Sequence, residues 1–313
     1  MTGKFQNRWA LFGAAALAAL GLAGCSIRHL AVHEVGSAVA GGGDTFASDD
    51  DPELVKAAAP FSLKLMESLL AEDPRNDALL LAAARGFTEY AYAFVQPDAD
   101  ALEVTDVAAA QAARARARRL YLRARDYGLR GLDVRHPGFA AALAARPAQA
   151  AAGAARADVP LLYWTAAAWG AAIAVAKDDP SLVADLPKIE AMIDRAVALD
   201  EAWDNGSLHG FLISYELVRG GRDAAERSRR EFERAVALSG GRLAAPYVSY
   251  AEAVPLQGQQ PEEFRRLLEQ ALAINPDAYP PARLANLVAQ RRARWLLSRL
   301  DDLFLQPPPP IGN

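Results

Sequence analysis

Few residues of the sequence have the types and the spacing that chemistry at a site requires. His29, His33 and Glu34 share one helical face and could hold a metal ion, but two histidines without further ligands favour a solvated segment. The sequence contains no phosphate-binding GxxxxGK[ST] loop, no GxGxxG dinucleotide motif and no GxSxG nucleophile elbow. The other two histidines, His136 and His209, have no suitably spaced partners. We therefore predict no catalytic residue, no metal, no cofactor and no enzymatic activity.

Cys25 has the most specific chemical role that the sequence indicates. It is the single cysteine and follows Leu22-Ala23-Gly24, which together resemble a bacterial lipobox. Lys4 and Arg8 precede an apolar run of about 15 residues, shorter than the roughly 20 of a membrane-spanning helix. We expect residues 1–24 to be a lipoprotein signal peptide and Cys25 to carry the lipid. The alternative is an ordinary signal peptide with an incidental cysteine.

Aromatic and arginine residues are the remaining candidates for binding. One interpretation is that a ligand or partner groove is lined by Tyr163, Trp164, Trp169 and Trp203, because these side chains combine a large apolar body with a polar atom. The alternative is packing between helices. The segment that ends near Tyr127 is crowded with arginines, which indicates either a polyanion site or a solvated face paired with nearby carboxylates. The second interpretation is favoured there.

A repeated helix ending indicates the architecture that must position these residues. Three segments place a bulky apolar residue three positions before a small alanine, at Ala196, Ala235 and Ala271. Their spacings of 39 and 36 residues (235 − 196 and 271 − 235) are close to the roughly 34-residue period of tetratricopeptide repeats. In such helical hairpins the small residue allows two helices to approach, and neighbouring hairpins stack into a curved array. The sequence therefore predicts an all-α fold of tetratricopeptide-like helical-hairpin repeats with flanking helices, forming a curved α-solenoid.

Composition and local patterns divide the chain into four parts. The chain is 52% hydrophobic and rich in alanine, and it lacks alternating β-branched runs, so no strand is expected. Residues 25–50 are glycine-rich and acidic and predict a flexible tether. Residues 51–305 predict a single helical-repeat domain, and 306–313 a Pro-rich tail. The net charge of −4 argues against a nucleic-acid partner.

Two details of the helical domain are specific enough to be checked. An acidic loop is expected from Gln96 to Asp106, because this segment contains Pro97 and four carboxylates. Gly128 and Gly131 are expected to end the arginine-rich helix that follows.

Several long segments, in order along the mature chain, have a pattern in common with one family. They are Phe94-Val-Gln-Pro-Asp-Ala-Asp100, residues 120–131, His136-Pro-Gly138, residues 163–169, Phe211-Leu-Ile-Ser-Tyr-Glu216 and residues 290–297. Together with the lipobox they resemble the TatT family, the T-components associated with tripartite ATP-independent periplasmic (TRAP) transporters. The resemblance implies an all-helical lipoprotein with cryptic tetratricopeptide repeats that assembles as a homotrimer. It also implies a pairing with the periplasmic solute-binding protein of a TRAP system.

The expected function is that of a lipid-anchored scaffold on the periplasmic side of the envelope. Such a scaffold docks the solute-binding protein and holds or passes a small solute. Ser26 follows the cysteine where an aspartate would indicate inner-membrane retention, so the outer membrane is the expected location. The alternative function is a generic tetratricopeptide-type outer-membrane lipoprotein that serves as adaptor for another envelope complex, such as a cell-wall synthase.

Overall fold

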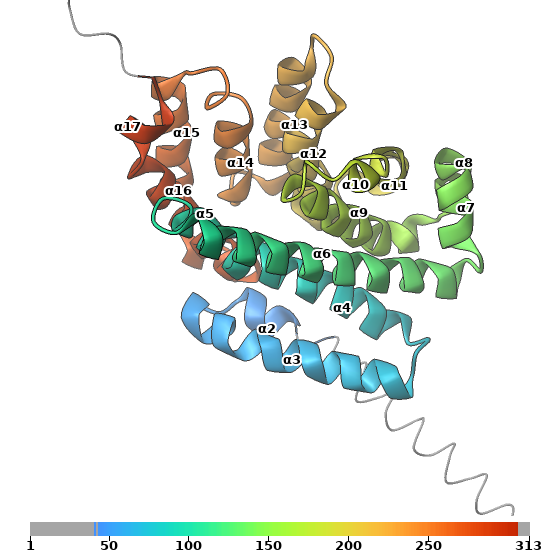
Figure 1. Cartoon of the computed structure of the whole chain (residues 1–313). Coiled ribbons are helices and arrows are strands. Elements are labelled where there is room, and N and C mark those ends of the chain that lie inside the picture. Colours follow the sequence, from blue (N-terminus) through green and yellow to red (C-terminus); the bar gives the residue numbers. More distant parts are fainter. Residues whose placement is uncertain (1–40, 42, 306–313) are drawn as a thin grey trace, which may run out of the picture.

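The structure is a computed structural model that describes residue 41 and residues 43–305 (Figure 1). Within these ranges every regular element is a helix, which confirms the predicted all-α class. The predicted signal peptide (1–24), Cys25 and the predicted Pro-rich tail (306–313) lie outside the described residues. So do His29, His33 and Glu34.

The helices follow one another in this order: α2 (Gly43–Ala47), α3 (Pro52–Glu72), α4 (Asp77–Tyr90), the π-helical turn η1 (Ala91–Val95), α5 (Gln96–Leu102), α6 (Val107–Arg135), α7 (Phe139–Ala145), α8 (Pro147–Ala152), η2 (Arg156–Asp158), α9 (Val159–Ala174), α10 (Pro180–Val183), α11 (Leu186–Asp200), η3 (Trp203–Gly206), α12 (Ser207–Arg219), α13 (Ala224–Ser239), α14 (Ala245–Ala253), α15 (Pro261–Ala273), η4 (Pro276–Ala278), η5 (Pro280–Ala282), α16 (Arg283–Leu297) and α17 (Leu300–Leu303).

Helix α6 is the central element of the fold. Its 29 residues span about 43 Å at 1.5 Å per residue, and Asp106 caps its first turn by accepting the Ala109 N–H at 2.9 Å. Helix α4 packs on one side of α6 and α9 on another (Figure 1). The buried alanines Ala117 and Ala124 allow these neighbours to approach closely.

The prediction that Gly128 and Gly131 end this helix is wrong, because both lie inside α6. They are the points of closest approach to α9. A Cβ atom on Gly128 would lie 2.1 Å from Oγ1 of Thr165, and one on Gly131 would lie 2.7 Å from Cδ2 of Leu161. Close packing between the two helices therefore requires glycine at both positions, although glycine stabilises a helix less than alanine does.

The prediction of a loop from Gln96 to Asp106 is also wrong over most of its length. The helical segment continues from α4 through the π turn η1 into α5 and ends only after Leu102. The π turn directly precedes Pro97, whose ring cannot accommodate the hydrogen-bond pattern of a regular helix interior. The backbone N–H of Gln96 donates to the carbonyl of Ala91, five residues back, so helical bonding continues up to the proline.

The N-terminal helices form a separate layer beside α4. Asp51 caps α3 by accepting the N–H groups of Glu53 and Leu54, both at 3.0 Å, and Pro52 occupies its first turn. The short helix α2 precedes it and contacts α16, and Arg283 donates to the carbonyl of Ser48 at 3.1 Å. The end of the segment predicted as a tether is thus helical and docked on the domain.

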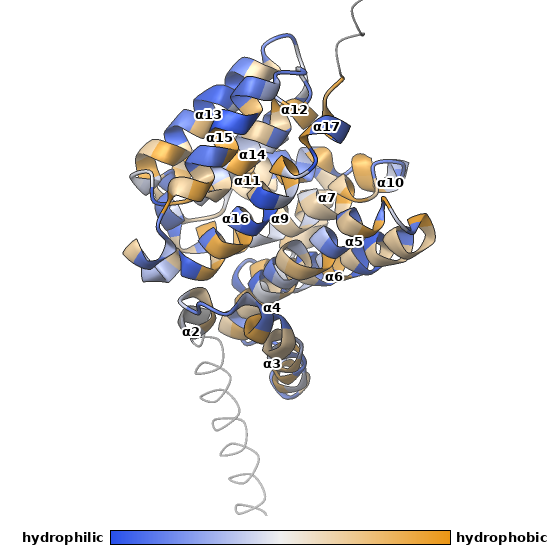
Figure 2. Ribbon diagram, turned by 90° about the vertical axis from the view of Figure 1, so that its left-hand side faces the viewer, coloured by the Kyte–Doolittle hydropathy of each residue, from blue (hydrophilic) through white to orange (hydrophobic). Residues whose placement is uncertain are grey.

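The C-terminal half contains the helices with the repeated endings. Helix α11 packs on α9, α13 on α12 and α15 on α14. Ala196, Ala235 and Ala271 are all buried in these helices, as the small positions of helical hairpins should be. Figure 2 shows hydrophilic residues along α13 and α15, whose other faces contribute to a core with α14 and α16. Stacking of the hairpins into one curved solenoid stays a prediction.

Helix α16 joins the C-terminal helices to the first helices that the structure describes. It contacts α2 and α3, and its Arg292 reaches Asp100 of α5 at 2.8 Å, across 192 positions of sequence. The same guanidinium donates to Glu252 of α14 at 2.6 Å. Arg292 therefore links three helices from both halves of the molecule.

Candidate functional site

Three of the four predicted groove residues lie together. The ring of Tyr163 contacts Trp164 edge-on and Trp203 at a tilt, with both pairs of ring centroids 4.9 Å apart. Tyr163 and Trp164 come from the second turn of α9, and Trp203 comes from η3, about 40 residues later. All three side chains are partly exposed, and Tyr163 and Trp203 also pack against the buried core around α9.

Trp169 lies elsewhere, in the core between the helices around α9. It is 5% exposed and has Arg125 on one side, 4.9 Å from its ring centroid, and Lys188 at 5.4 Å. The helical period explains the difference, because six residues past Tyr163 a side chain lies on a different face. The residue two turns after Tyr163 is Gly170, which faces Phe211. The structure therefore places Trp169 as a packing residue.

Tyr92 is a neighbour of this cluster that the sequence analysis missed. It lies on the π turn η1, and 55% of its surface is exposed, whereas the neighbouring aromatic residues Phe87 and Phe94 are buried. A π turn inserts an extra residue into the helix and rotates the following side chains, and such turns are frequent at functional sites.

Burial and neighbouring charges act on two titratable groups near this cluster. Burial raises the pKa of Tyr92. Burial likewise raises the pKa of Glu89, and Asp204 adds to the effect while Arg85 opposes it. We call the surface formed by Arg85, Glu89, Tyr92, Tyr163, Trp164, Trp203 and Asp204 the aromatic patch.

A left-handed turn positions one side of the aromatic patch. Asp204 and Asn205 have φ angles of 48° and 55°, and Gly206 follows at 86°. Aspartate, asparagine and glycine are the residues that tolerate this conformation best, so the sequence Asp-Asn-Gly makes the turn possible. Strained backbone of this kind is concentrated at functional sites, and here it aims Trp203 and Asp204 toward Tyr163.

The charges around Tyr163 are dominated by carboxylates. Burial raises the pKa of the Tyr163 hydroxyl strongly, and the negative charges of Asp204 and Glu89 raise it further. Arg85 opposes this effect and pairs with Glu89, with Nε 2.9 Å from Oε1, and its guanidinium lies 5.7 Å from the centroid of Trp164. The aromatic patch thus combines aromatic rings with a few charged groups.

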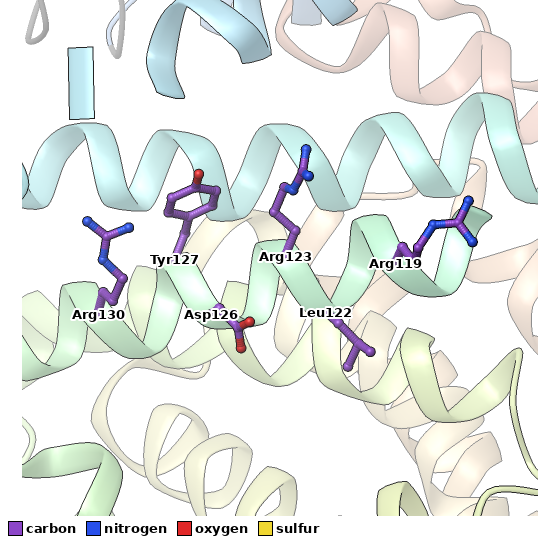
Figure 3. Close-up of a pocket in the computed structure, with 6 residues that line it drawn as sticks. All are labelled: Arg119, Leu122, Arg123, Asp126, Tyr127 and Arg130. Carbon is purple, nitrogen blue, oxygen red and sulfur yellow. The ribbon is translucent and has the colours of Figure 1, made fainter. Parts of the chain in front are cut away.

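A pocket lies on the surface of α6 (Figure 3). Its volume is about 370 Å³, and Arg119, Arg123 and Arg130 line it together with Tyr127. Arg123 lies 3.5 Å from Glu67, and Arg130 donates to the carbonyl of Pro74. Other arginines of the helix are also paired; they are Arg114 with Glu103, Arg118 with Asp179, Arg125 with Asp126 and Arg135 with Asp77. This pairing favours the interpretation of a solvated, neutralised face.

Each histidine of the described residues lies against a carboxylate. Nε2 of His136 lies 2.8 Å from Asp158, and Nδ1 of His209 lies 2.6 Å from Glu231. Among residues 43–305, no three metal-binding side chains converge on one point. Within the same range no helix has both the length and the apolar character needed to cross a bilayer.

Comparison with known proteins identifies the family. Residues 48–304 match the model of the family described as TRAP transporter T-component. The chain is also 30% identical over 269 residues to a protein of Treponema pallidum (strain Nichols) that is described as uncharacterized, and the match covers 83% of this chain and 82% of that one. The matched region begins just before α3 and ends after α17, so it spans the helical domain and every residue of the aromatic patch. The chain belongs to the TRAP transporter T-component family.

Proposed function

We propose that this protein is a scaffold of a TRAP transport system that docks the periplasmic solute-binding protein at the membrane. The aromatic patch is the surface at which a small solute is held during transfer between the solute-binding protein and the transporter. The observation that carries this proposal is the family match over residues 48–304. The partly exposed rings of Tyr163, Trp164 and Trp203 lie together within that range and support a role in binding.

The docking proposal is tested by co-purification from the native envelope. Tagged full-length protein is solubilised in detergent, captured and analysed by mass spectrometry. We expect a TRAP solute-binding protein among the recovered proteins. Repeated recovery of a cell-wall synthase, with no solute-binding protein, would support the generic envelope adaptor instead and overturn the TRAP assignment.

We also propose that Cys25 anchors the protein to the periplasmic face of the outer membrane. The support is the lipobox-like Leu22-Ala23-Gly24-Cys25 and the Ser26 that follows it. Labelled palmitate should be incorporated by the wild-type protein and not by Cys25→Ala. Incorporation that survives the substitution would show that the lipid is attached elsewhere or that the label is adventitious.

A homotrimer is the assembly that the family resemblance implies, and α3 offers a face for it. Leu54 and Phe61 lie two turns apart on the outer side of α3 and are 58% and 74% exposed. Exposed apolar side chains in one stripe are typical of helix–helix contacts between subunits. Light scattering should give a trimeric mass for wild type and a smaller mass for Phe61→Asp. A monomeric wild type would contradict the trimer.

A further inference from the structure

We propose that the pocket on the surface of α6 binds an anion that carries two phosphate groups. The pocket shares no residue with the aromatic patch, and the proposal does not depend on the docking of a solute-binding protein. Its volume of about 370 Å³ lies in the range of small-molecule pockets, and three of its six lining residues are arginines. Three features of these arginines support the assignment: their uncompensated charge, the support of their guanidinium groups and their spacing.

The pocket interrupts the pairing that neutralises most arginines of α6. Among the residues that the structure describes, the guanidinium of Arg119 has no ion pair and no hydrogen bond. Arg130 donates to the carbonyl of Pro74 at 3.2 Å, and this neutral acceptor leaves the charge of Arg130 uncompensated. The two ends of the pocket therefore each present a positive charge that no carboxylate balances.

The carboxylates at the pocket are already bound by other cations. Asp126, which lines the pocket, accepts hydrogen bonds from Nε and Nη2 of Arg125 at 2.9 and 2.7 Å. Arg123 lies 3.5 Å from Glu67, but Lys64 pairs with the same carboxylate. The pocket as a whole therefore keeps an excess of positive charge, as a site for an anion requires.

Aromatic rings support two of the three guanidinium groups. The guanidinium carbon of Arg123 lies 5.3 Å from the centroid of Phe87, and that of Arg130 lies 5.4 Å from the centroid of Tyr127. A guanidinium that stacks on a ring uses its flat face, so its N–H groups stay free to donate in the plane. Arg119, Arg123 and Arg130 project from the same side of α6 (Figure 3). The donors are thus oriented before a ligand binds, which lowers the entropy cost of binding.

The spacing of the arginines fits two phosphate groups and not one. Arg119 and Arg123 are four residues apart, so their side chains are neighbours on the helix and repel one another until an anion lies between them. Arg130 follows Arg123 two turns later, about 10.5 Å along the axis. A phosphate group accepts hydrogen bonds from several directions, and arginine binds it with two parallel N–H groups. Leu122 and the ring of Tyr127 lie between the two positions and offer apolar surface to the linker of the ligand.

The test titrates three soluble probes with the same sugar into the full-length protein in detergent. Fructose 1,6-bisphosphate, fructose 6-phosphate and fructose are compared by calorimetry at low ionic strength, because salt screens exposed charges. We expect the bisphosphate to bind about tenfold tighter than the monophosphate, as one further charged hydrogen bond provides, and fructose not to bind. Equal affinity of the two phosphates, or no saturable binding of the bisphosphate, would overturn the proposal.

Three variants at exposed arginines assign the effect to the pocket. Arg130→Gln should lower the affinity for the bisphosphate to that for the monophosphate and leave the monophosphate unchanged. Arg119→Gln should weaken both phosphates roughly threefold to tenfold. Arg222→Gln, between α12 and α13, is the matched control and should behave as wild type. Pocket variants that keep the wild-type circular dichroism and bind both phosphates as the control does would contradict the inference.

A lipid competition identifies the source of the two phosphates. Cardiolipin, a lipid with two phosphate groups, is mixed into the detergent micelles, and phosphatidylglycerol at twice the amount provides a control of equal charge. Displacement of fructose 1,6-bisphosphate by cardiolipin alone would assign the pocket to a lipid headgroup. Binding of the bisphosphate that neither lipid disturbs would assign it to a soluble anion.

Discussion

At the residue scale, Asp158 illustrates how a single carboxylate holds two helices in place. It is 4% exposed and accepts the Ala155 N–H at 2.8 Å, His136 at 2.8 Å and Arg135 at 3.3 Å. Burial alone would raise its pKa, but the hydrogen bonds from Ala155, His136 and Arg135 outweigh burial and lower it. The group joins the end of α6 to the start of α9.

A pH-dependent stability follows from that lowered pKa. The contribution of Asp158 is complete above the unfolded pKa near 4 and is lost as the pH falls through the lower folded value. Asp158→Asn should cost about 2–4 kcal/mol at pH 7, because Arg135 and His136 lose their buried partner. Urea unfolding should show this cost shrinking at about pH 3. An equal cost at both pH values would contradict the assignment.

The aromatic residues show how far residue types alone can predict a site. Amphipathic side chains make Tyr163, Trp164 and Trp203 candidates for a groove, and the structure brings their rings together. The same property makes Trp169 a candidate, but Trp169 is buried against Arg125 and Lys188. Residue type does not say which side of α9 faces the protein interior when almost every residue of the helix is apolar. That distinction depends on which helices pack around it.

At the element scale, substitution with alanine is expected to have opposite effects on stability at two glycines that lie inside helices. Gly128→Ala would place Cβ 2.1 Å from Oγ1 of Thr165, and we expect a loss of about 1–3 kcal/mol from overpacking. Gly210→Ala, inside α12 with no atom within 4 Å of the new Cβ, should gain about 0.5–1 kcal/mol from helix propensity. Chemical denaturation measures both. A neutral or stabilising Gly128→Ala would refute the close contact.

Local side chains determine where helices begin more than where they continue. Asp51, Asn76 and Asp106 all cap helices by accepting backbone N–H groups, and such capping depends on only three or four consecutive residues. The sequence predicts a loop at Pro97 and a helix end at Gly128, but both residues lie within helices. A π turn in one case and a close helix contact in the other override the local preference. Neither is visible without the neighbouring helix.

At the scale of the whole molecule, α16 links α5 of the N-terminal half to α14 of the C-terminal half. Arg292 bonds Asp100 and Glu252 with all three side chains less than one-third exposed. Arg292→Ala should cost about 1–3 kcal/mol and increase hydrogen exchange in α16 and α17. Arg291, whose pair with Glu53 is largely exposed on both sides, is the matched control and should cost less than about 1 kcal/mol on substitution with Ala. Similar exchange in the two variants would show that this link does not stabilise the arrangement.

The aromatic patch forms only when distant parts of the chain pack together, which is why the sequence predicted only part of it. Its residues come from α4, η1, α9 and η3, separated by up to about 120 positions. Tyr92 and Asp204 lacked any local pattern that would link them to Tyr163. Their charges and rings converge only because α9 packs against α4 and because a left-handed turn precedes α12.

The most direct test of the central claim is binding between purified partners. The full-length protein in detergent is titrated by calorimetry with the TRAP solute-binding protein encoded in the same genome. We predict saturable binding at a fixed ratio. The absence of heat and of any complex in size-exclusion chromatography, with both proteins folded and at high concentration, would contradict the scaffold function.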